Sequence, residues 1–319
     1  MKPLAAWRDG RVDASAIRRA AAALAAGALV GLPTETVYGL AARARDPEAV
    51  ARVFAVKGRP LDHPVIVHVA GPDDLGQWGV SVPGYAIALT RALWPGPLTV
   101  VVPAADDVPR YLTGGQDTVG LRCPAHPVAL ALIEAAGPLA APSANRFGRV
   151  SPTRAADVVA DLGDWLDPLR DLVLDGGDCP VGVESTILDC TGRSPRILRW
   201  GAIEHDEIHD AAGVTLSADQ SQVRAPGGLV SHYAPRARVH LTGTPHAGAG
   251  YLALADLPTP PGALRLAAPL TAREYAAVLY RALRDADARG LSAVWTVPPD
   301  DGTALATAVR DRLSRAAAG

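Results

Sequence analysis

Lysine is almost absent from this chain. Of its 31 basic residues only Lys2 and Lys57 are lysines, and the others are arginines. The guanidinium of arginine is a planar fork and the ammonium of lysine is a compact point charge, so the two are not interchangeable at a phosphate or carboxylate. We therefore expect Lys57 to be needed as an ammonium. The alternative is that it complements the C-terminus of a helix, where a cation is favourable for the helix alone.

Cysteines are also few, and no long apolar run occurs. The three cysteines, Cys123, Cys179 and Cys190, are odd in number and show no CxxC spacing, which favours reduced thiols that bind no metal. No uninterrupted apolar stretch is long enough to span a bilayer, and the N-terminal apolar stretch ends too early for a signal peptide. These absences predict a cytoplasmic protein without a membrane anchor.

An excess of positive charge is missing as well. The chain has 33 acidic residues against the 31 basic ones and a formal net charge of −2. This balance argues against a protein that holds nucleic acid through bulk attraction to phosphates.

Several nucleotide-site motifs are absent. Lys57 lies between Val56 and Gly58, so no P-loop is present, and neither a kinase H-R-D nor a G-x-S-x-G elbow occurs. The segment 248–253 fits a dinucleotide fingerprint only formally, because no acidic partner or helix follows it. His205 and His209 have metal-like spacing without a third ligand, so a solvated helix face is the better interpretation.

Strands and helices alternate along the chain, which predicts an α/β fold. Asp46-Pro47 predicts the start of a helix that ends at Lys57, and Asp13 or Ser15 caps a helix ending before Gly27. Other predicted helices are 85–93, 127–136, one opened by Ser151-Pro152-Thr153, 271–289 and 303–317. Strands are predicted at 28–32, 65–69, 98–102, 118–122, 139–141, 172–174, 186–190, 196–199, 238–242, 251–255, 263–266 and 292–297.

The segment after residue 216 is rich in Ser, Gln, Gly and Pro, which is typical of a linker. We therefore expect a first domain over residues 1–216, a linker over 217–236 and a smaller α/β domain over 237–319.

Four short polar segments stand mostly at predicted strand ends, where open α/β sheets bind ligands. They are Pro33–Leu40, Lys57–Pro60, Ala141–Asn145 and Gly182–Thr186. Taken singly, each has a structural explanation, because their hydroxyl and amide side chains are ordinary turn residues.

Taken together, these segments resemble the threonylcarbamoyl-AMP synthase family, whose catalytic unit is the YrdC-type domain. The resemblance covers roughly residues 10–240 and extends to Trp94–Thr99, Gly120–Arg122, Ser151–Thr153 and Leu198-Arg199. Pro226-Gly227 with His232–Pro235, followed by a second domain, is similar to the two-domain branch. The resemblance implies a twisted mixed sheet flanked by helices, plus a smaller Rossmann-like α/β domain.

The resemblance also implies the reaction. Members of the family convert L-threonine, bicarbonate and ATP into threonylcarbamoyl-AMP and pyrophosphate. The product passes to a transferase complex that modifies an adenosine of tRNA, while direct tRNA binding is expected to be weak or absent. Mg²⁺ is expected to accompany ATP, with no tightly bound prosthetic group.

Carried over by similarity, Lys57 and Arg59 are the predicted catalytic cations. The predicted ATP contacts are Lys57, Arg59, His63, Thr118, Ser143, Asn145, Ser151, Arg199 and Tyr233. The predicted threonine contacts are Thr36, His68, Arg122, Ala141 and Ser185. Two of these have ordinary alternatives. Arg122 could form a surface salt bridge at a strand end, and His68 could be a hydrogen-bonded core histidine.

The chain departs from the family pattern at Phe147, at Trp200 and at residues 228–231. The first two could reshape the adenine pocket or simply pack. Two other functions compete. The carbamoyltransferase of hydrogenase maturation needs cysteine-rich zinc modules that three cysteines cannot build. A non-enzymatic RNA-binding protein of the same fold is disfavoured by the near-neutral charge.

Overall fold

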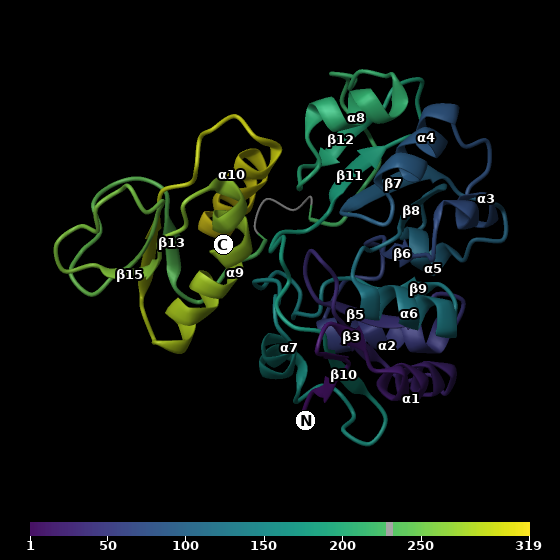
Figure 1. The fold of residues 1–319 in the computed structure, drawn as a ribbon, viewed down its shortest axis with the longest axis horizontal. Coiled ribbons are helices and arrows are strands. Elements are labelled where there is room, and N and C mark those ends of the chain that lie inside the picture. The colour runs from purple at the N-terminus through teal and green to yellow at the C-terminus, as the bar shows by residue number, and fades with distance from the viewer. Residues whose placement is uncertain (228–231) are drawn as a thin grey trace.

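A computed structural model of the protein describes residues 1–227 and 232–319. It has a ten-stranded mixed sheet, a four-stranded parallel sheet and a two-stranded ribbon. The ribbon pairs β2 (Trp7–Arg8) with β3 (Arg11–Val12). In Figure 1 the smaller sheet and its helices lie to the left of the larger unit. None of the helices in the described ranges combines the length and apolarity that a bilayer crossing requires.

The large sheet has the order β1-β10-β4-β5-β9-β6-β8-β7-β11-β12. It contains both parallel pairs such as β6/β8 and antiparallel pairs such as β7/β8, so it is a mixed sheet as predicted. The strands are β1 (Leu4–Ala5), β4 (Val30–Leu32), β5 (Gly39–Arg43), β6 (Ile66–His68), β7 (Leu98–Pro103), β8 (Thr118–Arg122), β9 (Leu139–Ala140), β10 (Leu172–Asp175), β11 (Thr186–Asp189) and β12 (Arg196–Arg199).

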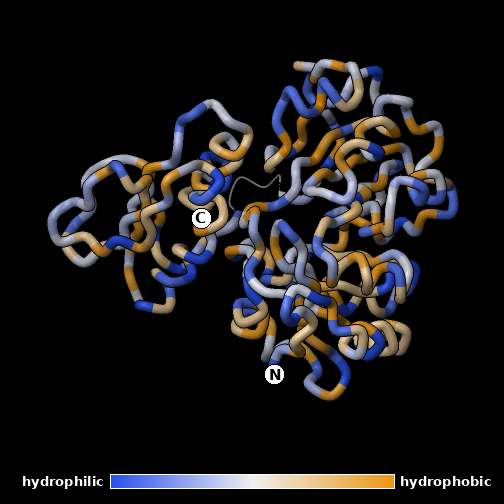
Figure 2. Tube along the Cα trace, in the orientation of Figure 1, coloured by the Kyte–Doolittle hydropathy of each residue, from blue (hydrophilic) through white to orange (hydrophobic). Residues whose placement is uncertain are grey.

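Helices cover both faces of this sheet. Successive residues of a strand point to opposite faces, and β5 shows the consequence. Leu40 and Ala42 pack in one buried cluster, while Ala41 packs in the other. The first cluster contains α2 (Pro47–Lys57), α4 (Gly84–Leu93), α7 (Ala155–Leu162) and α8 (His205–Ala212), and the second contains α1 (Ala14–Ala25) and α6 (Pro127–Ala136). Hydrophobic and hydrophilic residues are interspersed along the chain in both the larger unit and the C-terminal domain (Figure 2).

Helix α2 sets the position of the two predicted cations. The Asp46 side chain accepts a hydrogen bond from the backbone N–H of Ala49, and Pro47 occupies the first turn. Gly58 ends the helix with φ at 61°, a left-handed conformation that glycine adopts without steric cost. Lys57 is therefore the last helical residue, and Arg59 begins the loop beyond it.

The C-terminal domain is built on the four-stranded sheet, in the order β13-β16-β14-β15 with all pairs parallel. Its strands are β13 (Arg238–His240), β14 (Gly250–Leu252), β15 (Leu264–Ala267) and β16 (Ala293–Thr296). Helices α9 (Ala272–Ala288) and α10 (Ala304–Ala317) lie between this sheet and the larger unit (Figure 1). The parallel sheet agrees with the predicted smaller α/β domain.

Some predicted boundaries were wrong. Strand β5 was not predicted, and the helix expected to open at Ser151 begins only at Ala155. Seven of the twelve predicted strands are one or two residues shorter than predicted, and β7 and β10 are each one residue longer. Asp13, not Ser15, caps α1 by accepting from the N–H groups of Ser15 and Ala16. The short elements α3 (Leu75–Trp78), α5 (Arg110–Thr113) and the 3₁₀ turn Pro72–Asp74 were also not predicted.

Candidate functional site

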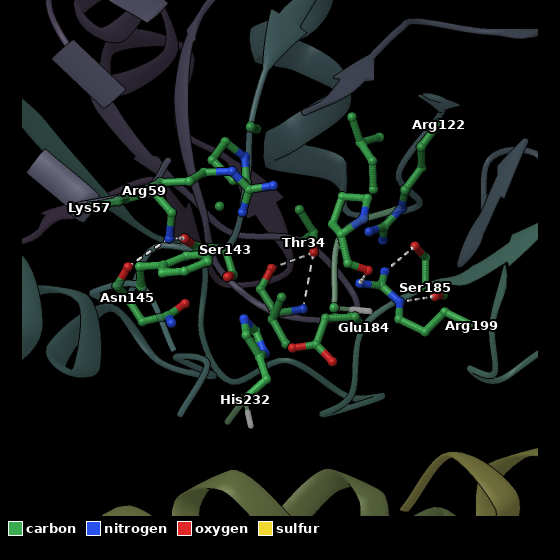
Figure 3. A pocket seen from close by; sticks show the side chains of 18 of the residues that line it. Thr34, Lys57, Arg59, Arg122, Ser143, Asn145, Glu184, Ser185, Arg199 and His232 are labelled. Carbon is green, nitrogen blue, oxygen red and sulfur yellow. Dashed lines mark hydrogen bonds between the residues drawn. The ribbon is translucent and has the colours of Figure 1, made fainter. Parts of the chain in front are cut away.

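One pocket gathers most of the predicted site residues (Figure 3). It opens where β6, β8 and β12 end and where α2 meets the loop after β9. The predicted residues in its wall are Lys57, Arg59, His68, Arg122, Ala141, Ser143, Asn145, Ser185, Arg199 and Tyr233. Its cavity is about 60 Å³, far below the roughly 300–1,000 Å³ of typical ligand pockets. Four linker residues, Pro226, Gly227, His232 and Tyr233, belong to the wall of this small cavity.

Lys57 is buried at the end of α2, and its ammonium binds the loop after β9. Nζ donates a hydrogen bond to the carbonyl oxygen of Asn145 at 2.6 Å and another to that of Ser143. The sequence grouped Lys57 with Ser143 and Asn145 as ATP contacts, and in the structure its ammonium contacts their backbone directly. An ammonium has three N–H donors, so these two bonds leave one for a ligand. Burial, with a contribution from Arg59, lowers the pKa of Lys57 well below its ordinary value.

Arg59 lies beside an aromatic wall. Its Nη2 donates to the carbonyl of Pro64 at 2.7 Å, while its Nε is buried without a hydrogen-bond partner. The guanidinium lies 5.8 Å from the Phe147 ring centroid, and that ring contacts the imidazoles of His63 and His232 edge-on. Burial lowers the pKa of Arg59 to about 10. Phe147, one of the departures from the family pattern, is therefore part of the pocket wall.

Arg199, at the end of β12, connects the sheet to the linker. Its Nε and Nη2 donate to the backbone carbonyl and the hydroxyl of Ser185, each at 3.1 Å. Its Nη1 donates to the carbonyl of Pro226 at 3.2 Å. Tyr233 is buried, has a left-handed backbone with φ at 62°, and its hydroxyl has no hydrogen-bond partner.

Arg122 and His68 are brought together by strand register. The parallel pairing of β6 with β8 sets His68 opposite Arg122. Arg122 Nη2 lies 2.7 Å from the Glu35 carboxylate in a buried ion pair, so the salt bridge is not on the surface. The ion pair is not aligned as a hydrogen bond, and Nε and Nη2 of Arg122 both lack hydrogen-bond acceptors. Burial and the charge of Arg122 lower the pKa of His68 to about 3, so its imidazole is neutral near pH 7.

Four predicted residues do not line the pocket, and their roles stay predictions. His63 packs behind Phe147, and Thr118 borders a neighbouring depression next to Pro226. Ser151 donates to the Glu184 carboxylate at 2.6 Å. The hydroxyl of Thr36 lies 2.9 Å from that of Thr34, and Thr34 is the one that reaches the pocket.

Two ionisable residues of the wall, Glu184 and His232, were given no role from the sequence. Both stand inside segments that carried the family resemblance, but nothing in the sequence separated them from their neighbours. Burial alone would raise the pKa of Glu184, yet Arg312 and Arg199 outweigh it and lower the pKa to about 2. Burial lowers the pKa of His232 to about 4. The glutamate is therefore charged and the histidine neutral near pH 7.

The remaining expectations concern the other departures from the family pattern and a possible metal site. The departure at residues 228–231 lies outside the described residues. Trp200, the other departure, packs its ring 4.7 Å from that of His205 and against the C-terminal domain, away from the pocket. Within the described ranges, no group of three or more His, Cys, Asp or Glu residues could hold a metal ion.

Comparisons with known proteins show which proteins the chain resembles. Residues 22–201 match a protein family described as "Telomere recombination", and residues 203–318 match "Threonylcarbamoyl-AMP synthase, C-terminal domain". The chain is 43% identical over 236 residues to the threonylcarbamoyl-AMP synthase of Pyrococcus abyssi, covering 72% of this chain and 68% of that protein. It is 42% identical over 229 residues to that of Bacillus subtilis, covering 69% and 65%.

A solved structure extends the likeness to the whole fold. The crystal structure of P. abyssi Sua5 complexed with L-threonine has a TM-score of 0.88 and 35% identity, covering 100% of this chain and 98% of that one. The relatives are named as enzymes, so the interpretation as a non-enzymatic RNA-binding protein loses its support.

Proposed function

Because this chain belongs to the threonylcarbamoyl-AMP synthase family, we propose that it joins L-threonine, bicarbonate and ATP into threonylcarbamoyl-AMP and releases pyrophosphate. One observation carries the proposal. Lys57, Arg59, Arg122 and Arg199, from three separate segments, line one pocket in which Glu184 is already paired with Arg312. Such a pocket suits a substrate with several negative charges.

The proposed reaction has two bond-forming steps. The unprotonated amine of threonine attacks the carbon of bicarbonate, from which water leaves, or the carbon of CO₂ derived from it, in which case a proton is released. Either route gives a carbamate. A carbamate oxygen then attacks the α-phosphorus of ATP, the bond to the β-phosphate oxygen breaks, and pyrophosphate leaves with that electron pair. No protein nucleophile is needed. The residues have to position the reactants and stabilise the negative charge that develops.

For the ATP half, we assign the phosphate chain to Lys57, Arg59 and Arg199. The remaining N–H of Lys57 and the unpartnered Nε of Arg59 are the donors that support this assignment. Mg²⁺ would enter as part of the MgATP substrate, held by the phosphates, which is the usual way in which this ion is bound at nucleotide sites.

For the threonine half, we assign the carboxylate to Arg122 and the amine to the neighbourhood of His68. A guanidinium binds a carboxylate through two parallel hydrogen bonds, and the Nε and Nη2 atoms of Arg122 are without hydrogen-bond acceptors. A neutral imidazole does not repel an amine that has to become nucleophilic, which supports the second assignment.

We further propose that the linker covers the site and gates nucleotide exchange. The support is that its residues Pro226, Gly227, His232 and Tyr233 border a cavity of about 60 Å³, so these residues have to withdraw before ATP enters. The division into a domain over 1–216, a linker over 217–236 and a domain over 237–319 is part of this proposal. The packing of Ile208 and Leu216 on the first core supports the first boundary.

The product would then serve tRNA modification. A carbamate–phosphate anhydride is an activated acyl donor, so we propose that a tRNA threonylcarbamoyl transferase complex consumes it.

Mass spectrometry of a reaction containing the full chain, MgATP, L-threonine and bicarbonate tests the proposed product. We expect the mass of threonylcarbamoyl-AMP, and a shift of one mass unit when the bicarbonate carries ¹³C. The appearance of ADP and phosphate in place of AMP-linked product would overturn the proposal.

A further inference from the structure

Two side chains of the C-terminal domain hold the carboxylate of Glu184. Arg312, from α10, donates from Nε to Oε2 at 3.0 Å. The hydroxyl of Tyr280, from α9, lies 2.9 Å from Oε2 and 3.2 Å from Oε1. Ser151 donates to Oε1 from the first domain. The carboxylate is thus fixed between the two domains, although it belongs to the wall of the pocket.

The backbone next to Glu184 also lies directly against the C-terminal domain. Gly182 approaches α9 so closely that a Cβ on it would meet the carbonyl oxygen of Ala276 at 2.3 Å and Cα of Ala277 at 2.4 Å. Arg312 makes a second contact across the interface: its Nη2 donates a hydrogen bond to the backbone carbonyl of Trp200, in the first domain, at 2.9 Å. The segment that bears Glu184 is therefore docked by its main chain as well as by its carboxylate.

A short chain of contacts leads from Glu184 to the predicted substrate contacts. The next residue, Ser185, lines the pocket and accepts two hydrogen bonds from Arg199. The hydroxyl of Ser185 is also 2.8 Å from that of Thr99 on β7. A shift of Glu184 would move Ser185 and release the guanidinium of Arg199, which points into the pocket (Figure 3).

We propose that Arg312 and Tyr280 are positioning residues for the active site, through which the C-terminal domain holds Glu184, Ser185 and Arg199 in the geometry that binds substrates. This inference rests on the proposed function, because it concerns the same pocket. It gives the C-terminal domain a role in ordering the site that is separate from the movement of the linker.

The charges around Glu184 explain why both members of the Glu184–Arg312 ion pair are needed. The charged and titratable groups that act on it are Arg312 on α10, Tyr280 on α9, Arg199 on β12, and His232 and Tyr233 on the linker. The Arg312 side chain is fully enclosed and that of Glu184 is only 8% exposed, so water screens the pair little. Removing one member of such a pair leaves an uncompensated buried charge, which is far more damaging than removing both.

The test uses four variants of the full chain: Arg312→Met, Tyr280→Phe, Glu184→Gln, and Arg312→Met combined with Glu184→Gln. Arg310→Met is the matched control, because Arg310 lies on the same helix and pairs with exposed Asp300. The readouts are the melting temperature, the Kd for ATP, and the kcat and KM of pyrophosphate release. Tyr280→Phe removes a single oxygen and keeps the ion pair, so it reports on positioning even if Arg312→Met folds poorly.

We expect Arg312→Met to lower kcat/KM by about 10²-fold, as small displacements of positioning groups do, with KM for ATP rising more than kcat falls. Tyr280→Phe should give a smaller change in the same direction, and Arg310→Met none. Glu184→Gln should lower the melting temperature in the wild-type background but raise it in the Arg312→Met background, where it removes an unpaired charge.

The inference is overturned if Tyr280→Phe and Arg312→Met keep the wild-type KM and Kd for ATP, or if Glu184→Gln lowers the melting temperature equally in both backgrounds. The proposed function fails on a different result, namely pyrophosphate release by the wild type that does not depend on threonine and bicarbonate. In that case the role of Arg312 is still decided by comparing the ATP Kd and the melting temperature of its variants with those of the wild type.

Discussion

In our proposal, Lys57 performs two tasks that an arginine cannot combine. Its ammonium holds the backbone carbonyls of Ser143 and Asn145, and in our proposal its third N–H reaches a phosphate. A guanidinium is larger and its donors lie in a plane, so it cannot direct bonds to three sides from a buried position. The scarcity of lysine in the sequence is thus matched by an environment that accepts only an ammonium.

We predict that Lys57→Ala and Lys57→Arg each lower kcat for pyrophosphate release by at least about 10²-fold, the loss expected when a buried electrostatic group is removed. Lys57→Ala also leaves two carbonyls unpaired, at a cost of about 1–3 kcal/mol in the free energy of unfolding. Lys2→Ala, which changes the exposed lysine, is the matched control. Near-normal turnover by Lys57→Arg would refute this account of the residue.

His68 makes a prediction about pH. Its pKa is about 3 in the folded chain against an ordinary 6.5, so between these values the unfolded chain binds a proton that the folded chain does not. Stability is therefore lost as the pH falls from about 6.5 towards 3. We expect His68→Gln to reduce the drop in melting temperature between pH 7 and pH 4. His246→Gln, at an exposed histidine, should leave the drop unchanged, and an equal drop in all three proteins would contradict the prediction.

At the residue scale the sequence located the cations but not their partners. The scarcity of lysine singled out Lys57, and the resemblance to the family singled out Arg59, Arg122 and Arg199. Glu184 was not, because its importance comes from contacts with residues about one hundred positions later in the chain. Local patterns contain no information about such a partner.

At the scale of single elements, local signals predicted well wherever a cap or a β-branched run was present. Helix α2 has the predicted bounds because Asp46, Pro47 and Gly58 mark both of its ends, and β8 and β12 also agree. Strand β5 was missed because its sequence, Gly39–Arg43, is rich in alanine and lacks β-branched residues. It is a strand only because β4 and β9 pair with it on either side.

The end of α2 is expected to be sensitive to substitution. Gly58 and Gly148 both have left-handed backbones, with φ at 61° and 79°, so alanine costs about 1 kcal/mol at either site. A Cβ on Gly58 would also meet the Arg146 guanidinium at 2.8 Å, whereas one on Gly148 meets nothing within 4 Å. We predict that both variants melt at a lower temperature but that only Gly58→Ala loses turnover, because it displaces Lys57. Equal turnover in the two variants would show that this helix end does not set the site.

At the scale of the whole molecule, the sequence predicted two units and a linker but not how they dock. The interface between the two domains depends on the close fit of their surfaces, and Gly182 is the clearest example of that fit. Its left-handed backbone at φ 79° and its close approach to α9 leave no space for a side chain. A sequence pattern indicates a turn at such a glycine and gives no sign that another domain lies against it.

We predict that Gly182→Ala weakens the contact between the domains and lowers both the melting temperature and the affinity for ATP. Gly177→Ala is the matched control, because Gly177 has φ at 87° but a Cβ on it would meet nothing within 4 Å. The two variants share the backbone cost of a left-handed alanine, so the difference between them reports the interface. Indistinguishable melting curves and ATP affinities would show that the interface does not need this close approach.

The central claim, that one cationic pocket joins three substrates, is tested most directly by the rate of pyrophosphate release when each substrate is omitted in turn. We predict release with MgATP, L-threonine and bicarbonate together, and release close to background when any one of them is missing. Release that persists with MgATP alone, at the same rate as with all three, would contradict the claim.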